Sequence, residues 1–246
     1  MRIDLVTLFP AMFAGVFGSS IIGRAVQRGL IDIHYTDFRD YATDKHHHVD
    51  DTPCGGGAGM VLKPEPIYAA VRDVWAKTAA FAERRCTIIF DPAGKAFTQQ
   101  TAKELASYDQ LVLICGHYEG FDQRVYDLAD RLISVGDFVL TGGEIPAMLT
   151  VDATARMLPG VLGDDTSAPT DSFFDALLGY PQYTRPRVFE GKAVPDVLLS
   201  GNHAEIARWR REQSLLRTMR HRPELLPLAK LTTEDLLFLS KQDEKW

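Results

Sequence analysis

Compact apolar runs bounded by turn residues constrain the fold of this chain more than any other feature. Cys86–Phe90 and Leu111–Cys115 are two such runs, and they are typical of strands buried on both faces of a parallel sheet. Three further strand candidates are Ile3–Phe9, Ile31–Thr36 and Arg131–Val135. The N-terminal part of the chain therefore carries five candidate strands.

Segments with helical features separate these strands. Pro64–Ala82 begins with a proline, which suits the first turn of a helix, and its apolar residues recur on one face. Thr98 can cap a helix through Ala106, and Ser20–Leu30 and Glu144–Leu158 are two further candidates. Strands that alternate with helices predict an α/β domain with a mainly parallel sheet.

The character of the sequence changes after the last of these helices. Residues 161–175 are rich in Gly, Asp, Ser and Pro, which predicts a flexible interdomain linker. An α/β domain over residues 1–160 and a small, mainly helical domain over residues 176–246 are therefore expected. In the second domain Asn202 can cap a helix to about His221. The apolar side of that helix is expected to carry Ile206, Trp209, Leu216 and Met219, and Thr233 is expected to open a last helix through Lys241.

Composition excludes several classes of protein. The 246 residues carry 27 basic and 33 acidic side chains, a net charge of -6, which argues against a uniformly basic nucleic-acid coat protein but not against a local basic face. Three cysteines without a CxxC pair exclude a disulfide framework and a zinc ribbon. No secretory signal is evident, and no apolar run approaches the roughly 18 residues of a membrane span. A cytoplasmic protein with reduced thiols and no membrane partner is expected.

Three glycine-containing loops follow strand candidates. They are Asp91–Gly94, Cys115–Gly120 and Gly136–Glu144. Loops at the carboxyl ends of parallel strands share one edge of the sheet, where open α/β folds bind ligands. Each loop alone is most simply a tight turn, but together they favour a ligand site. The chain has neither a GxGxxG dinucleotide motif after the first strand nor a GxxxxGK[ST] phosphate loop, so both of these nucleotide-binding folds are disfavoured.

Three other segments leave alternatives open. His46–His48 lies in a polar stretch expected to be irregular, and it favours a solvated or partner-binding loop over a metal site, because its neighbours have no established ligand spacing. Gly55–Met60 is either a hinge or a loop that lies flat against a ligand or a second subunit. The late arginines suit phosphate contact or a solvated helix face. These arginines, with a neighbouring histidine, are Arg208, Arg210, Arg211, Arg217, Arg220, His221 and Arg222.

Longer strings of residues resemble a known family. The chain is similar to the bacterial tRNA (guanine-N1)-methyltransferases, which methylate guanosine 37 beside the anticodon. The likeness is carried by Cys115–Gly120 and Ser134–Ala147, and it spans essentially the whole chain. The other matching segments are Gly23–Val26, Val49–Met60, Pro159–Gly163, Asp171–Phe173, Tyr183–Pro186 and Leu198–Ile206.

This resemblance implies a fold and a cofactor. It implies a SPOUT-type parallel sheet with a C-terminal trefoil knot, a homodimer whose active sites use both subunits, and S-adenosylmethionine as methyl donor, with possible Mg²⁺ dependence and unknown metal ligands. It assigns donor binding to the first domain and tRNA binding, with no DNA partner, to the second. The implied cofactor-binding residues are Pro92, Gly94, Gly116, Tyr118, Ser134, Val135, Gly136, Asp137, Phe138, Val139, Leu140, Gly142, Gly143 and Pro146.

The resemblance also implies three catalytic residues. Asp171 is the implied general base, Arg156 the cation that stabilises charge on guanine O6, and Glu119 a residue that holds the target guanine. These residue types suit methylation of guanine N1, because N1 carries a proton that a base must remove and a cation can stabilise the charge that then develops. Two positions depart from the family pattern: Ala93 stands where Gln is typical, and His117 where Arg is common.

Three alternative functions remain. The first is a related enzyme that modifies another RNA position. The second is an RNA-binding module without catalysis, which turnover of S-adenosylmethionine would distinguish. The third and weakest is a metal hydrolase centred on His46–His48 and Asp50, which elemental analysis of the purified protein would test.

Overall fold

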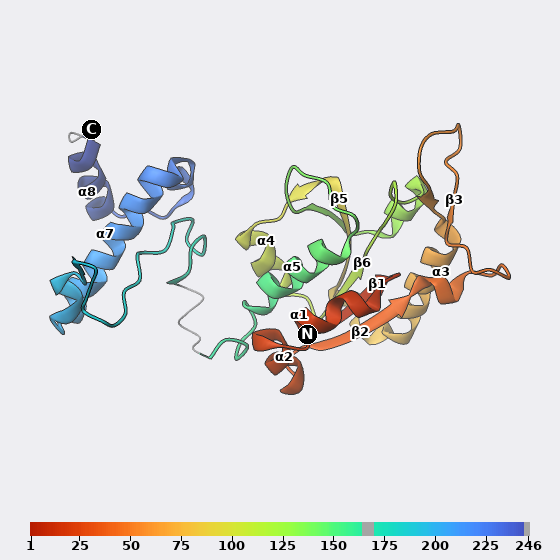
Figure 1. The fold of residues 1–246 in the computed structure, drawn as a ribbon, viewed down its shortest axis with the longest axis horizontal. Helices are drawn as coiled ribbons and strands as arrows, with labels where there is room; N and C mark the ends of the chain where they lie inside the picture. The colour runs from red at the N-terminus through yellow and green to blue at the C-terminus, as the bar shows by residue number, and fades with distance from the viewer. Residues whose placement is uncertain (164–169, 244–246) are drawn as a thin grey trace. The chain divides into compact units, whose positions relative to one another are not determined.

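The computed structural model describes residues 1–163 and 170–243, and these residues form two compact units. The units are Met1–Asp164 and Asp165–Trp246, shown from red to green and from green to blue in Figure 1. The division falls within the segment predicted as a linker, of which residues 164–169 lie outside the described part of the chain. Each unit is described by itself.

A five-stranded, wholly parallel sheet forms the centre of the first unit, in the order β2-β1-β6-β5-β7. This confirms the predicted parallel α/β fold. The strands are β1 (Arg2–Thr7), β2 (Asp32–Asp37), β5 (Arg85–Ala96), β6 (Gln110–Ile114) and β7 (Arg131–Ser134). Two short antiparallel strands, β3 (Asp50–Asp51) and β4 (Val61–Leu62), pair outside the sheet.

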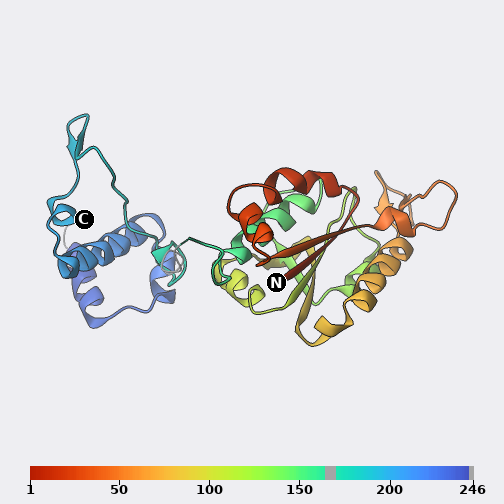
Figure 2. The same ribbon diagram turned by 90° about the horizontal axis from the view of Figure 1, so that it is seen from below.

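Helices cover both faces of this sheet, which explains why Leu111–Ile114 in its central strand is apolar and buried without interruption. One face packs against α1 (Ala14–Phe17), α2 (Ser20–Gln27), α4 (Gln99–Leu105) and α5 (Glu144–Ala155). The other packs against α3 (Pro64–Lys77), and Figure 2 shows α3 opposite α1, α2 and α5. The 3-10 helices of this unit are η1 (Pro10–Phe13), η2 (Phe38–Tyr41), η3 (Ala79–Arg84) and η4 (Gln123–Leu128).

Several predicted boundaries differ from the structure. The first strand ends at Thr7, because the Thr7 hydroxyl accepts the Phe9 backbone N–H at 3.0 Å and turns the chain out of the sheet. The Pro64 helix ends at Lys77 and continues as η3. The strand predicted over Cys86–Phe90 extends to Ala96 through a bulge beside β7. The polar stretch around His46–His48, Asp37–Gly59, was predicted to be irregular but contains η2 and β3.

The second unit is mainly helical. Its longest helix is α7 (His203–His221), and Asn202 caps it as predicted, accepting the Glu205 backbone N–H at 3.3 Å. The other elements among its described residues are α8 (Thr233–Asp243), β8 (Val188–Phe189), β9 (Lys192–Ala193), η5 (Asp196–Leu199) and η6 (Pro223–Leu228). No helix among the described residues of either unit is long and apolar enough to span a membrane.

The buried side of α7 differs from the predicted one. Its buried residues are Ser214, Leu215 and Thr218, whereas Trp209 and Leu216 are only half-buried. The Thr218 hydroxyl accepts the backbone N–H of Leu178 at 2.9 Å and donates to the Ser214 carbonyl at 2.7 Å. A neighbouring loop therefore covers a partly polar strip that apolar periodicity does not reveal.

Candidate functional site

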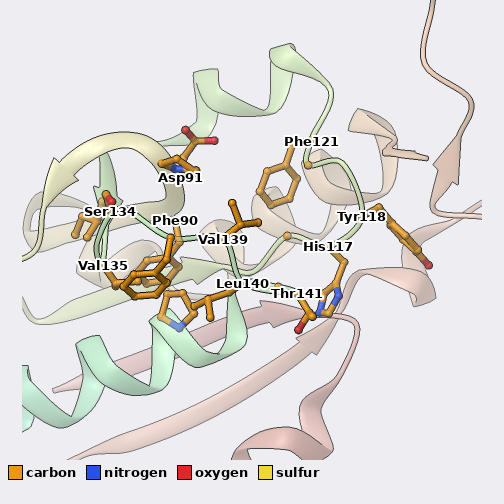
Figure 3. A pocket seen from close by; sticks show the side chains of 18 of the residues that line it. Phe90, Asp91, His117, Tyr118, Phe121, Ser134, Val135, Val139, Leu140 and Thr141 are labelled. Atoms are coloured by element: carbon orange, nitrogen blue, oxygen red, sulfur yellow. The ribbon is translucent and has the colours of Figure 1, made fainter. Parts of the chain in front are cut away.

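A cavity of about 270 Å³ lies at the carboxyl ends of β5, β6 and β7 in the first unit. Figure 3 shows its walls: the turn after Phe90, the loop from His117 to Phe121, and the segment from Ser134 to Thr141. These are the three glycine-containing loops identified in the sequence, and the sheet brings them to one edge, as expected for parallel strands.

The cavity contains most of the residues predicted to bind a cofactor. They are Pro92, Gly116, Tyr118, Ser134, Val135, Gly136, Phe138, Val139, Leu140, Gly142, Gly143 and Pro146. Glu119, predicted to hold the target base, lines the same cavity. These residues were assigned from separate parts of the sequence, and the fold now places them together.

Gly94 and Asp137 do not line the cavity. A side chain on Gly94 would stand 2.5 Å from the backbone nitrogen of Ile133, so Gly94 is the point where the bulge of β5 closes against β7. Asp137 is exposed. Gly94 therefore packs closely against β7, and its contact with a cofactor stays a prediction.

Eight further residues of the cavity wall were not among the predicted cofactor contacts. Asp91, His117, Gly120 and Thr141 belong to the three predicted loops, whereas Phe90, Phe121, Tyr126 and Ile133 lie outside them. Phe90 and Ile133 belong to apolar strands and look like ordinary core residues. Only the loops beside them carried a signal, because glycine and polar residues followed each strand.

Asp91 stabilises the turn beside the cavity. Its carboxylate accepts the Tyr126 hydroxyl at 2.6 Å and the Ala93 backbone N–H at 2.8 Å. Burial and the hydrogen bond to Asp91 raise the pKa of Tyr126, so this phenol stays protonated at neutral pH. The turn is thus held by the side chain of Asp91, next to Ala93, where the sequence departs from the family pattern.

A buried carboxylate lies beneath the opposite wall. Glu144, the first residue of α5, is completely buried. Its carboxylate accepts the Thr7 hydroxyl at 2.6 Å and is 2.7 Å from Nε2 of His117. The negative charge also lies at the amino end of a helix, where the helix dipole favours an anion.

Glu119 lies between the cavity and the glycine-rich loop. Its backbone N–H donates to the Met60 carbonyl at 3.0 Å, and any side chain on Gly59 would collide with the Glu119 carboxylate. The Gly55–Met60 segment, which the sequence left open between a hinge and a ligand-facing loop, therefore lies against a residue of the cavity wall.

Arg156 and Asp171 belong to different units. Arg156 caps the end of α5 in the first unit, with its backbone N–H donating to the Asp152 carbonyl at 3.3 Å. Asp171 is exposed in the second unit, beside a small groove that Arg210 and Arg211 also line. The roles that the resemblance implies for Arg156 and Asp171 stay predictions.

The arginines of α7 differ in whether a neighbouring acidic side chain neutralises their charge. Arg211 is paired with Asp235 of α8 at 2.8 Å, and Arg222, which follows the last residue of α7, is paired with Glu224. Arg217 donates to the neutral Gly179 carbonyl at 2.9 Å, and Arg210 lies 4.9 Å above the Tyr180 ring. Because neither contact neutralises charge, the predicted basic face is reduced rather than removed.

Arg210 also lines a larger cavity of the second unit. This cavity, of about 900 Å³, contains the aromatic side chains of Tyr183 and Trp209, whose ring centroids are 6.3 Å apart. Arg185 and Arg187 line it as well, and both are exposed. Aromatic rings beside guanidinium groups are a common surface for single-stranded or extruded bases.

The histidine run forms an exposed loop. Asp44 orders this loop, since its carboxylate accepts the backbone N–H groups of His46 at 2.9 Å and His48 at 2.8 Å. Desolvation opposes the effect, but these hydrogen bonds and the His48 side chain lower the pKa of Asp44 to about 2. The described residues contain no group of three or more His, Cys, Asp or Glu side chains placed to hold a metal ion.

Two of the three cysteines are core residues. Cys86 and Cys115 are completely buried in or beside the sheet, and burial raises the pKa of the Cys86 thiol to about 11. Burial, with the nearby Glu144 charge, raises the pKa of Cys115 well above its ordinary value. Both thiols are therefore protonated and unreactive at neutral pH.

Comparison with known proteins identifies the family. The family model described as tRNA (guanine-1)-methyltransferase TrmD matches residues 1–228. A tRNA (guanine-N(1)-)-methyltransferase of Limosilactobacillus reuteri is 53% identical over 246 residues, which cover 99% of this chain and 98% of the relative. The Pelotomaculum thermopropionicum protein of the same name is 55% identical over 236 residues, covering 96% and 93%. The chain is therefore an enzyme of the tRNA (guanine-1)-methyltransferase family.

Proposed function

We propose that this enzyme transfers the methyl group of S-adenosylmethionine to N1 of guanosine 37 in tRNA, in the cytoplasm. Family membership sets the reaction class, and the observation that carries the proposal is the cavity formed by three loops at one edge of the sheet. The proposed roles are Asp171 as general base, Arg156 as the cation facing guanine O6, and Glu119 as a contact to the target base.

The cavity suits a nucleoside that carries a positive charge. Its described lining has apolar side chains such as Phe138, Val139 and Leu140, backbone groups of glycine loops, and the acids Asp91 and Glu119, but no lysine or arginine. A phosphate-bearing ligand would lack a counter-ion there, whereas a sulfonium would not. S-adenosylmethionine, once bound, supplies an electrophilic methyl group on sulfur.

The protein must then make guanine N1 nucleophilic. N1 carries a proton at neutral pH, so its electron pair is unavailable for attack. In the proposed step Asp171 accepts that proton, the N1 electron pair forms the bond to the methyl carbon, and the carbon–sulfur bond breaks to leave a neutral thioether. The charge that develops on O6 is stabilised by Arg156. Glu119 is available at the wall beside Gly59 to hold the base.

A homodimer is proposed because the first unit exposes an apolar face. Its residues are Phe9, Met12, Val16, Tyr35, Ile145 and Leu149, each more than 40% exposed. They are neighbours, because η1 contacts α5 and the ring of Phe13 lies 5.7 Å from that of Tyr35. A contiguous apolar face of this kind is typical of subunit contacts. In such a dimer the active site would draw Asp171 of the partner subunit to the cavity.

The trefoil knot remains part of the same proposal. The chain after β7 returns to the chain after β6: Gly143 donates to the Gly116 carbonyl at 2.9 Å, and His117 pairs with Gly142. In the sheet, β5 lies between β6 and β7, so these two segments meet across its end. This crossing supports the threading expected of the family.

Recognition of tRNA is proposed for the second unit. The support is the exposed charge of Arg210 and Arg217 on α7 and the cavity in which Arg185 and Arg187 accompany Tyr183 and Trp209. Local charge of this kind can bind phosphates although the whole chain has a net charge of -6.

The test supplies labelled S-adenosylmethionine with two tRNA transcripts. One carries guanosine at positions 36 and 37, and the other has adenosine at position 37. We expect label only in the first transcript. Equal labelling of both would reject the assignment to position 37, and label in neither would favour another RNA target.

A further inference from the structure

The hydrogen bond between His117 and Glu144 joins a residue of the cavity wall to a buried carboxylate. Glu144 is completely buried, and the side chain of His117 is 16% exposed and lines the cavity. A buried carboxylate is costly unless hydrogen bonds satisfy both oxygens. Here the Thr7 hydroxyl donates to one oxygen at 2.6 Å, and Nε2 of His117 lies 2.7 Å from the other.

The direction of this hydrogen bond follows from its partners. An ionised carboxylate only accepts, so Nε2 of His117 carries the hydrogen. Phe9 also packs against this ring, and the two ring centroids lie 4.6 Å apart at an interplanar angle of 60°. The imidazole is therefore held by two contacts, the hydrogen bond to the carboxylate at the start of α5 and the aromatic ring of Phe9.

The bond lies directly beneath the loop that follows β7. His117 pairs with Gly142 through the backbone, and a side chain on Gly142 would stand 2.6 Å from Oε2 of Glu144 and would collide with Nε2 of His117. Gly142 therefore packs directly against the two side chains that form this hydrogen bond. The preceding residues of this loop have little other support, since Phe138 is 57% exposed and Val139 is 90% exposed.

We propose that His117 is a positioning residue. Through its hydrogen bond to Glu144, it holds the 138–143 segment in the position required to bind the methyl donor. The two sides of the cavity come from different strands, β6 and β7, and this bond ties them to each other and to the start of α5. The inference rests on the proposed function for the identity of the ligand. The proposed function thereby gains a residue, His117, that takes no part in the chemical step but sets the affinity for the donor.

The test measures binding of S-adenosylhomocysteine by calorimetry, with no methyl transfer and no tRNA. His117→Phe keeps a ring against Phe9 but removes the donor to Glu144, and we expect its dissociation constant to rise about tenfold or more, since hydrogen bonds to buried charges are strong. His117→Gln restores an N–H donor and should return to within about threefold of wild type. Tyr41→Phe removes a 2.5 Å hydrogen bond to Asp73 outside the cavity and should leave binding unchanged.

Melting temperatures of the same proteins separate positioning from general stability. If His117→Phe melts earlier but binds the nucleoside as wild type does, or if His117→Gln fails to restore binding, the positioning role is wrong. If His117→Phe does not fold, His117→Asn, whose amide is too short to reach Glu144, replaces it. Failure of wild type itself to bind the nucleoside would overturn the proposed donor, and this inference with it.

Discussion

Gln110 offers a way to separate the stability of the first unit from its ligand site. It is completely buried at the start of β6, at the edge of the sheet opposite the cavity. Its side-chain amide donates to the Asp4 carboxylate at 2.7 Å and to the Thr78 hydroxyl at 3.0 Å, and its carbonyl accepts from Arg85 at 2.7 Å. Gln110→Leu keeps the volume but removes all three hydrogen bonds.

The expected loss can be built from these contacts. Asp4 is buried and keeps Arg2 as a partner, so losing one hydrogen bond to its charge costs about 2 kcal/mol. Thr78 and Arg85 keep other partners, and together their losses add about 1 kcal/mol. We therefore expect the free energy of unfolding of the first unit to fall by about 3 kcal/mol, with unchanged binding of S-adenosylhomocysteine.

Urea unfolding measures this change. Trp75 reports on the first unit when Trp209 and Trp246 are replaced by phenylalanine, and an unchanged slope with a lower midpoint indicates a change in stability alone. The exposed Gln100→Leu on α4 is the matched control and should change stability by less than about 0.5 kcal/mol. A loss below about 1 kcal/mol in Gln110→Leu, or weaker ligand binding, would refute the reasoning.

Three further predictions concern catalysis, assembly and pH. Asp171→Ala should lower methyl transfer by about 10²-fold or more while S-adenosylhomocysteine binding persists; an active variant would reject the general-base role. Met12→Glu should dissociate the proposed dimer in light scattering, whereas Leu228→Glu, exposed on the second unit, should not. The hydrogen bond from Arg211 lowers the pKa of Asp235. The stability that this pair gives the folded state is therefore present above the ordinary carboxyl pKa of ~4 and is lost as pH falls through the lowered value. Trp209 fluorescence should therefore show a larger loss of thermal stability from pH 7 to 3 in wild type than in Asp235→Asn.

The parallel sheet could be predicted because its central strands are buried on both faces. Leu111–Cys115 has no polar residue, and only a strand covered by helices on two sides permits that. The shared edge of the three loops followed from the same rule. Boundaries failed where a side chain redirected the backbone, as Thr7 does at Phe9.

The hydrogen-bonded part of the site could not be predicted in the same way. Glu144 begins a helix, and an exposed first-turn acid gives the same sequence pattern as this buried one. Its partners are His117 and Thr7, the latter 137 residues away in the chain. Contacts between residues so distant in sequence depend on the packing of strands and leave no local periodicity.

The central claim is methyl transfer to one atom of one nucleoside, and the most direct measurement locates that methyl group. The enzyme is incubated with S-adenosylmethionine and the tRNA transcript that carries guanosine 36 and 37, and the product is analysed by reverse transcription and by mass spectrometry of its nucleosides. A methyl group on N1 blocks base pairing, so we predict a strong stop at position 37 together with 1-methylguanosine. A methylated transcript that is copied through position 37, or a methylguanosine of another type, would contradict the account.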